Sequence, residues 1–261
     1  MSISKRFLPR IIPVLLLQNR GALVKTKQFT NPVYVGDPLN AVKIFNEKEV
    51  DELVLLDISA SKNDKDPDYD YIEQIATECF MPVTYGGGVK TLEQFKRIIA
   101  CGIEKVSLNT AATRSPELVT EAAAHFGNSS VVVSIDAIKD FFRGRKIFAH
   151  MKQKTLNDDP INVAKKMEVL GAGEILLQSV NRDGTMEGYD LDLINEVSHA
   201  VSIPVIACGG AGKLNDFAQA FQAGASAVAA GSKFVFFGKH RAVLINYLSH
   251  DEIEQLVVAE R

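Results

Sequence analysis

The amino-acid sequence predicts an α/β protein that folds as a (βα)8 TIM barrel. Eight short apolar runs are bounded by turn residues, and each is followed by about 10–15 residues of helical periodicity, which is typical of βαβ units around a parallel sheet. A segment of the first half of the chain returns in the second half at a constant spacing. Closure of eight strands into two similar half-barrels accounts for both observations.

The eight predicted strands follow one another at similar intervals. In chain order they are residues 11–17, 52–57, 82–85, 105–108, 131–136, 174–178, 204–207 and 227–230. No Pro- or Ser-rich linker interrupts them, so we expect one domain over residues 1–261, with half-barrels at about 1–125 and 126–261. A doubly wound open sheet is the alternative fold, but the even spacing and the internal symmetry favour a closed barrel.

Helix start signals lie between the predicted strands. Thr91 and Gln94 have the spacing of a capping box, in which each side chain bonds the backbone of the other residue. The run Ser115-Pro116-Glu117 places a serine N-cap ahead of a proline in the first helical turn. The segment 139–156 is expected to include a long loop after the fifth strand, which would act as a mobile lid.

The internal repeat relates residues 81–110 to residues 203–232. The matched residues lie 122 positions apart, and they include Pro82 and Pro204, Gly88 and Gly210, Phe95 and Phe217, and Gly102 and Gly224. The same offset relates Glu52 to Glu174. Four βα units therefore occur twice, which predicts a two-fold internal symmetry of the barrel.

Two glycine-rich loops follow the third and seventh predicted strands, which are equivalent in the repeat. In a (βα)8 barrel the loops after the strands form the active face. Glycines let backbone N–H groups approach an anion, and a following helix N-terminus adds partial positive charge. A single glycine cluster is common in any α/β fold, but two at matched positions predict a ligand with a phosphate at each end. The predicted phosphate-binding residues are Gly87, Gly88, Asn109, Thr110, Gly209, Gly210, Gly231 and Ser232.

Carboxylates also lie at the ends of predicted strands. Asp136 follows an almost entirely apolar run, where a carboxylate is costly unless it is used or paired. Asp57 ends the second strand, and Asp183 follows the sixth, where it could simply form a turn. None of the five histidines falls at a predicted strand end, so neither a metal site nor histidine catalysis is expected, and no cofactor is predicted.

The composition excludes several other classes of protein. The formal net charge is −3 and no Lys/Arg-rich block occurs, so a nucleic-acid partner is not expected. No stretch approaches the roughly 18 apolar residues of a membrane span. The three cysteines are odd in number and show no CxxC spacing, so a disulfide framework is not indicated and a reducing cytoplasm is the expected location.

A series of motifs resembles the cyclase subunit of imidazole glycerol phosphate synthase. The motifs occur in order from about residue 6 to about residue 240; they are RIIP, DELVLLDISAS, YGGGV, EKVSLNTAA, SIDA, GAGEILLQSVNRDGT and ACGGAG. The phosphoribosylformimino-carboxamide ribotide isomerase of the same pathway shares the glycine loops and the RDGT run. It lacks the KVSLNT form of the fourth strand, so it ranks second.

The resemblance implies a reaction of ammonia with a bisphosphorylated ribonucleotide, which closes an imidazole ring and releases a carboxamide ribotide. A glutaminase subunit at the other end of the barrel would supply the ammonia through the barrel centre. The charged residues that ring this entrance in the family match Arg10, Glu52, Lys105 and Glu174. These four could instead form a paired structural plug. The catalytic residues assigned on this basis are Asp136, Lys25, Asp57 and Asp183.

The chain departs from the family at the predicted active face. The family's first strand ends in Cys-Leu-Asp-Val, and its aspartate works opposite the strand-5 aspartate as general acid and base, whereas Leu16 takes that place here. Gln178 and Asn181 replace a usual threonine and a usual aspartate. Two hypotheses follow. Under the first, the chain resembles paralogues that work with a sugar amidotransferase and pass ammonia to it, for amidation of a modified sugar of surface polysaccharide such as lipopolysaccharide. Under the second, it is a genuine cyclase of histidine biosynthesis that tolerates the change.

Overall fold

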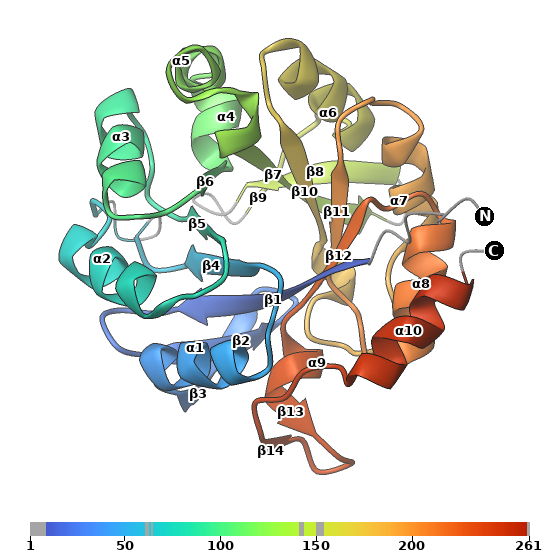
Figure 1. Cartoon of the computed structure of the whole chain (residues 1–261). Helices are drawn as coiled ribbons and strands as arrows, with labels where there is room; N and C mark the ends of the chain where they lie inside the picture. Colours follow the sequence, from blue (N-terminus) through green and yellow to red (C-terminus); the bar gives the residue numbers. More distant parts are fainter. Residues whose placement is uncertain (1–8, 61–62, 64, 141–143, 150–153, 260–261) are drawn as a thin grey trace, which may run out of the picture.

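A computed structural model describes residues 9–60, 63, 65–140, 144–149 and 154–259. Eight parallel strands close into a barrel, and helices surround it (Figure 1). Strand β1 pairs with β4 on one side and with β12 on the other, which completes the ring. The predicted (βα)8 barrel is therefore confirmed. Its strands are β1 (Arg10–Leu17), β4 (Leu53–Asp57), β5 (Val83–Gly86), β6 (Lys105–Leu108), β7 (Val131–Asp140), β10 (Glu174–Ser179), β11 (Val205–Cys208) and β12 (Ala227–Ala230).

The helices cover the outside of the barrel (Figure 1). The longer ones are α1 (Pro38–Glu47), α2 (Tyr69–Glu78), α3 (Leu92–Ala100), α5 (Glu117–Phe126), α6 (Pro160–Val169), α7 (Leu191–Ser198), α8 (Leu214–Gln222) and α10 (His250–Ala259). Two short helices, α4 (Thr110–Arg114) and α9 (Ser232–Val235), directly follow β6 and β12. No helix among the described residues has both the length and the apolar character that a membrane span requires.

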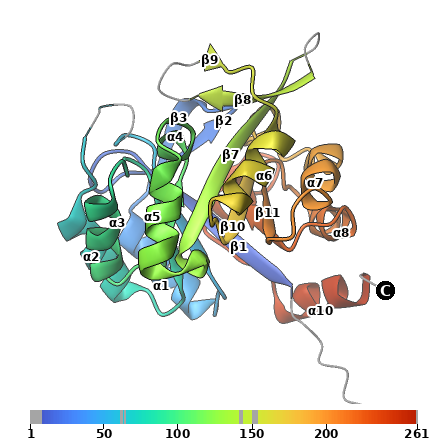
Figure 2. The same cartoon turned by 90° about the horizontal axis from the view of Figure 1, so that it is seen from above.

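Two antiparallel hairpins that the sequence analysis did not foresee stand at the carboxyl ends of the barrel strands. Strands β2 (Leu23–Lys27) and β3 (Thr30–Gly36) extend from β1. In the segment 139–156, β7 continues to Asp140 and pairs with β8 (Gly144–Ala149), which pairs with β9 (Lys154–Thr155). Most of the expected loop is therefore strand, and its residues 141–143 and 150–153 lie outside the described residues. Figure 2 shows β2, β3, β8 and β9 together at one end of the barrel, with α10 near the other.

The strand pairing of the two hairpins follows the internal repeat. Leu16 of β1 pairs with Val24 of β2, and 122 positions later Ile138 of β7 pairs with Lys146 of β8. A third, smaller hairpin is formed by β13 (Phe236–Phe237) and β14 (Ala242–Val243) after α9.

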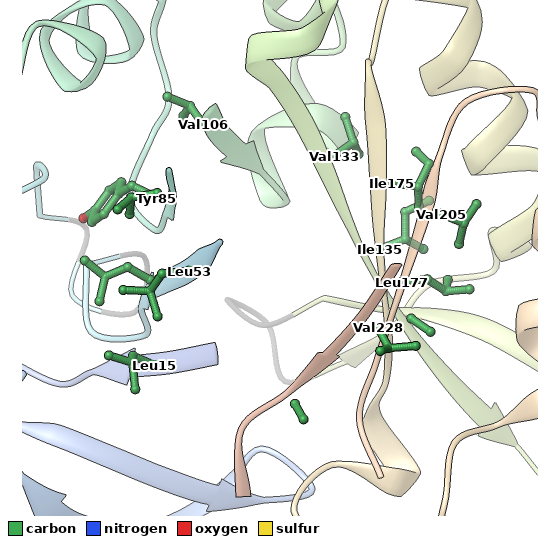
Figure 3. Packing of buried hydrophobic residues seen from close by; sticks show 14 of the residues in the cluster. Leu15, Leu53, Tyr85, Val106, Val133, Ile135, Ile175, Leu177, Val205 and Val228 are labelled. Atoms are coloured by element: carbon green, nitrogen blue, oxygen red, sulfur yellow. The ribbon is translucent and has the colours of Figure 1, made fainter. Parts of the chain in front are cut away.

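The alternation of side chains along the strands divides the core into two layers. One set of apolar residues points outward and packs against the helices (Figure 3), including Leu15, Leu53, Tyr85, Val133 and Leu177. The alternate residues fill the barrel interior, including Ile12, Val14, Val54, Val132, Leu176 and Ile206. Because side chains alternate with a period of two, polar side chains at the last inward positions are directed to the barrel mouth.

Helix caps agree with the sequence in one case and differ in the other. The Thr91 hydroxyl accepts from the backbone N–H of Gln94 at 3.2 Å, and the Gln94 side chain accepts from Thr91 N–H, so the predicted capping box is confirmed. The predicted Ser115 cap is wrong. Pro116 occupies the cap position of α5, and no side chain caps this helix. Pro116 has helical backbone angles, with φ at −62° and ψ at −20°, and its ring offers no oxygen to accept from the first turn.

Close contacts at the barrel mouth recur at the offset of 122 residues. Gly87 lies against the carbonyl group of Asp57, and Gly209 lies against the carbonyl group of Ser179. A Cβ atom at Gly209 would come within 2.8 Å of that carbonyl oxygen, and φ is +116° at Gly87 and +93° at Gly209. Both positions therefore require glycine for the approach of neighbouring loops, whether or not an anion is bound.

Candidate functional site

A cavity of about 380 Å³ opens at the carboxyl ends of the barrel strands, and we call it the mouth cavity. All four predicted catalytic residues line it. Of the eight predicted phosphate-binding residues, only Gly88 does not. No group of three or more His, Cys, Asp or Glu side chains among the described residues is placed to hold a metal ion. The strand ends thus bring together side chains that are far apart in the sequence, as expected for the active face of such a barrel.

Asp136 is buried at the end of β7 and is held by a neighbouring amide. Asn109 Nδ2 donates to Asp136 Oδ2 at 2.9 Å and to the Ser134 carbonyl at 3.1 Å. Asp136 is 4% exposed. The sequence analysis assigned Asn109 to phosphate binding, whereas in the structure its amide orients the Asp136 carboxylate.

Leu16 gives the mouth cavity an apolar wall. Its side chain packs with Leu56, its neighbour in register on β4, against the apolar barrel interior. Among the described residues, the acids that line the cavity are Asp57, Asp136 and Asp183. Within the part of the chain that the structure describes, no further carboxylate lines the cavity in place of the one that the family resemblance leads us to expect at Leu16.

Asp57 bonds to its own loop. Its Oδ1 atom accepts from the backbone N–H of Ser59 at 2.8 Å, from the Ser59 hydroxyl at 2.7 Å and from the backbone N–H of Ala60 at 3.0 Å. This is the pattern of an Asx turn, in which the carboxylate shapes the chain that follows it. Asp57 therefore fixes the loop after β4 beside the Gly87 loop.

Asp183 fastens the β2–β3 hairpin to the loop after β10. Its Oδ2 atom accepts from the Thr26 hydroxyl at 2.9 Å and from the backbone N–H of Phe29 at 3.3 Å, while Gln178 Nε2 donates to Oδ1 at 3.3 Å. Its carbonyl accepts from the backbone N–H of Gln28 at 3.0 Å. Burial raises the pKa of this carboxyl, and the bonds from Thr26 and Phe29 oppose that rise. Asp183 thus does more than form a turn.

Lys25 reaches from β2 into the mouth cavity. Its ammonium group donates to the carbonyl of Val14 on β1. The residue is 4% exposed, and burial lowers the pKa of the ammonium to about 8, against the opposing attraction of Asp183. The lysine is thus a cation taken almost completely out of water.

Side chains of the first helical turn bond the backbone N–H groups just before the two helices that follow the glycine loops. In α8, Asp216 Oδ2 accepts from the backbone N–H of Gly212 at 2.8 Å and of Lys213 at 2.9 Å. In α3, Gln94 Oε1 accepts from the backbone N–H of Lys90 at 2.7 Å. These three N–H groups are therefore already bonded within the chain, and the glycine loops and the side chains beside them remain as candidate anion ligands.

The four charged residues at the opposite end of the barrel form a closed ring of ion pairs, which we call the entrance ring. Arg10 lies 2.6 Å from Glu52 and 2.8 Å from Glu174. Lys105 lies 3.2 Å from Glu52 and 3.1 Å from Glu174. Each acid is thus bonded to both bases. This geometry provides the mutual pairing that charges at a barrel end require, and it fits both the plug and the entrance interpretation.

Sequence reasoning missed the residues that hold the mouth cavity in shape. Thr26, Gln28 and Phe29 bind the loop after β10, although nothing in the sequence marks them. The β2–β3 turn lacks glycine, and φ is +52° at Gln28 and +61° at Phe29. A hairpin signal normally depends on Gly or Asn at such positions, so this turn was not recognisable.

Comparison with known proteins gives consistent results. The family model described as "Histidine biosynthesis protein" matches residues 10–241. The protein named "Putative imidazole glycerol phosphate synthase subunit hisF2" of Pseudomonas aeruginosa is 52% identical over 91% of this chain and 95% of its own length. A protein of Leptospira interrogans with a similar name, ending in HisF, is 49% identical over 95% and 98%.

A third relative is named "Imidazole glycerol phosphate synthase subunit HisF" and comes from Petrotoga mobilis. It is 44% identical over 86% of this chain and 89% of its own length. The family model and these relatives cover most of the chain. The chain therefore belongs to the histidine biosynthesis protein family, as a HisF-type barrel.

Proposed function

We propose that the chain is the ammonia-using barrel subunit of a glutamine amidotransferase and that a separate glutaminase subunit supplies the ammonia. Its family and its similarity to proteins named as HisF subunits of imidazole glycerol phosphate synthase support this role. The entrance ring and the mouth cavity lie at opposite ends of the barrel, which suits a small nucleophile that enters at one end and reacts at the other. Under this proposal the four paired charges surround the entrance for ammonia, in addition to stabilising the barrel end.

The substrate that we propose for the mouth cavity carries two phosphates. The glycine loops and the following strand ends occur in two sets related by the internal repeat, and both sets border the same cavity. A two-fold arrangement of this kind places the sets on opposite sides of the barrel axis. Bulky replacement of Gly210, which lies against the Gly188 carbonyl, is expected to weaken binding of a bisphosphate ligand.

The absence of a carboxylate at Leu16 carries the finer proposal. Asp136 remains as one proton-transferring group, but the wall formed by Leu16 and Leu56 offers no second one. Loss of a positioned general acid or base typically costs about 10²–10⁴-fold in rate. We therefore propose that ring closure is not the main activity. The barrel would convey ammonia onward, to amidation of a nucleotide-linked or lipid-linked sugar of surface polysaccharide by a sugar amidotransferase.

The second candidate is ring closure itself, as in histidine biosynthesis. The retained bond between Asn109 and Asp136 supports it, because an oriented carboxylate at the mouth cavity is what acid–base catalysis needs. Under this alternative the product pair would be imidazole glycerol phosphate and the carboxamide ribotide.

Turnover of the bisphosphorylated ribonucleotide with ammonium salt separates these candidates. The wild-type protein is expected to show little or no ring closure, and Leu16→Asp is expected to recover part of it. Leu56→Asp is the matched control, since it places a carboxylate on the adjacent strand in register with residue 16. Efficient turnover by the wild-type protein would reject the conveying role and establish ring closure.

A further inference from the structure

The β13–β14 hairpin carries three of the large apolar side chains that the described part of the chain exposes to solvent. Phe237 on β13 is 63% exposed, and Val243 on β14 and the adjacent Leu244 are each at least half exposed. All residues from 237 to 244 are exposed, and Figure 1 shows the hairpin projecting away from the barrel beyond α9. Apolar side chains gathered in this way on a surface typically mark a site of interaction.

The same hairpin is basic. Lys239, His240 and Arg241 lie at its tip, and no Asp or Glu occurs between Asp216 and Asp251. The whole chain has a formal net charge of −3, so this stretch differs in sign from the molecule as a whole. Arginine and aromatic side chains are enriched at protein interfaces, and a basic surface favours an acidic partner.

The hairpin is an addition to the repeated barrel unit. In the first half, α4 ends at Arg114 and α5 begins at Glu117, so the chain passes almost directly from one helix to the next. In the second half, α9 ends at Val235 and α10 begins at His250, and the hairpin lies between them. The family model ends at residue 241, within the hairpin. One half of the barrel thus closes without such a hairpin, so closure does not account for its exposed side chains.

A hydrogen bond holds the hairpin against the rim of the mouth cavity. Arg241 Nη2 donates to the carbonyl of Gly184 at 3.1 Å, and the Arg241 guanidinium lies 4.8 Å from the centre of the Phe236 ring. Gly184 lines the mouth cavity and lies against the Thr26 carbonyl of β2. The loop after β10 therefore lies between the β13–β14 hairpin and the β2–β3 hairpin, at the edge of the mouth cavity.

A partner that covers the hairpin must also reach this rim. One side of a stable protein interface takes about 20–30 residues, which is more than the exposed residues 237–244 supply. The neighbouring strand β3 offers Val33 and Tyr34, which are also exposed. An interface of ordinary size that includes both hairpins extends over the loop after β10 and borders the opening of the mouth cavity.

We propose that the β13–β14 hairpin docks the enzyme that accepts ammonia from this barrel, through an acidic and apolar surface of that enzyme. The inference rests on the conveying role proposed above. Ammonia that escapes into water near neutral pH is protonated to ammonium, which has no lone pair for nucleophilic attack. The acceptor enzyme must therefore cover the mouth cavity while ammonia crosses. A second copy of this chain does not suit the hairpin, because a two-fold contact through it would bring the basic tips together.

Site-specific photocrosslinking in the source cell identifies the occupant. Phe237→benzoylphenylalanine places the crosslinker on the hairpin, and Lys165→benzoylphenylalanine, at an exposed position of α6, is the control. The variant at position 237 is expected to capture an ammonia-consuming amidotransferase, identified by mass spectrometry, and the variant at position 165 is not. Capture of a second copy of this chain at position 237, or of no ammonia-consuming enzyme, would overturn the inference.

An ammonia trap tests whether the contact conveys ammonia. Amidation driven by glutamine is measured with the glutaminase, this chain and the captured enzyme, with and without glutamate dehydrogenase, 2-oxoglutarate and NADPH, which together consume free ammonia. The wild type is expected to keep most of its activity in the trap. Phe237→Ser and Lys239→Glu should lose about tenfold or more there, on the scale of an interface hot spot, whereas the control Lys165→Glu should behave as the wild type.

The outcomes separate this inference from the function on which it rests. Efficient ring closure by the wild type with ammonium salt would reject the conveying role itself. Amidation that resists the trap equally in the wild type and in both hairpin variants would overturn the docking role of the hairpin and leave the conveying role in place. Flotation with vesicles that contain phosphatidylglycerol is the last measurement. Binding of the wild type that is lost in Lys239→Glu would assign the hairpin to a membrane surface and overturn the inference.

Discussion

At the scale of single residues, the orientation of Asp136 depends on a contact across neighbouring strands. Asn109 directly follows β6 and bridges Asp136 and the Ser134 carbonyl of β7. From the sequence, both Asp136 and Asn109 could be placed at strand ends, and the missing carboxylate at Leu16 was visible. The hydrogen bond between Asn109 and Asp136 could not be predicted, because the sequence indicated that both Asn109 and Thr110 donate to a ligand. Which donor turns to a carboxylate depends on the strand register, and that register arises only when the barrel closes.

The buried Lys25 is expected to reduce stability at neutral pH. Its folded-state pKa of about 8 is below its ordinary value of 10.5, so between these pH values the unfolded chain binds more protons and stability rises with pH. Lys25→Met should therefore be more stable than the wild type at about pH 7, by on the order of 3 kcal/mol, and this gain should shrink toward about pH 10. Urea unfolding of both proteins at both pH values measures it. A difference that is the same at both would contradict the lowered pKa.

At the scale of elements, the β2–β3 hairpin depends on bonds made at its strained turn. The Thr26 hydroxyl bonds Asp183, and the Phe29 ring lies 6.0 Å from the Phe148 ring of β8. Thr26→Val removes the hydroxyl while keeping the shape, and it should cost about 1 kcal/mol of local stability. Amide hydrogen exchange in β2 and β3 should accelerate about fivefold. Thr30→Val is the control, since the Thr30 hydroxyl bonds the Lys27 carbonyl within the same hairpin. Equal acceleration in both variants would argue against the Asp183 contact.

The β7–β8 arm is anchored on helix α7 by Arg145. This guanidinium bonds Glu196 at 2.8 Å and Asp190 at 2.9 Å, and its side chain is 15% exposed. Arg145→Ala should destabilise the fold by about 1–3 kcal/mol, because the Asp190 carboxylate loses a half-buried partner. Arg20→Ala is the matched control: Arg20 pairs at 3.7 Å with Asp68, the repeat equivalent of Asp190, but its side chain is 61% exposed.

Denaturant unfolding compares these two arginine variants. The exposed Arg20 pair should contribute about 0–1 kcal/mol, so a loss at Arg20 as large as that at Arg145 would show that burial does not set the difference.

Elements differed in how far the sequence could predict them. The barrel strands were predictable because each is a short apolar run between turn residues, and β6 and β12 have the predicted bounds. The β2–β3 hairpin was missed because contacts with other loops, and not turn residues, stabilise it. Gln28 and Phe29 adopt left-handed conformations that their residue types disfavour. Local sequence carries no signal for a conformation that is imposed from a distance.

At the scale of the whole molecule, the entrance ring lies at the end of the barrel where, under the proposed function, ammonia from the glutaminase enters. Lys105→Met leaves Arg10 as the one base of the ring that bonds Glu52 and Glu174, and it opens the ring on one side. Activity driven by glutamine in the presence of the glutaminase should fall by about tenfold or more, on the scale expected when a charged hydrogen-bonded group is lost. Activity driven by ammonium salt should change much less. Lys105→Arg should retain the activity driven by glutamine. Equal loss of both activities would indicate a structural plug.

The overall architecture was the most predictable level. A constant offset between two glycine loops, two prolines and two glutamates indicated two equivalent halves, and closure of the sheet between β1 and β12 follows. Equivalent helix caps continue the pattern, since Asp68 accepts from Tyr71 N–H and Asp190 from Leu193 N–H, both at 3.1 Å. What the repeat could not reveal is where the halves differ in single side chains such as Lys25.

The composition of the entrance ring bears on how the two halves recognise one another. Arg10, Glu52 and Lys105 come from the stretch before about residue 125, whereas Glu174 alone comes from the stretch after it. Separated fragments would thus present opposite net charge at this surface. Each fragment would repel a copy of itself and attract the other, so the salt bridges favour correct reassembly of a divided polypeptide over homodimerisation of its pieces.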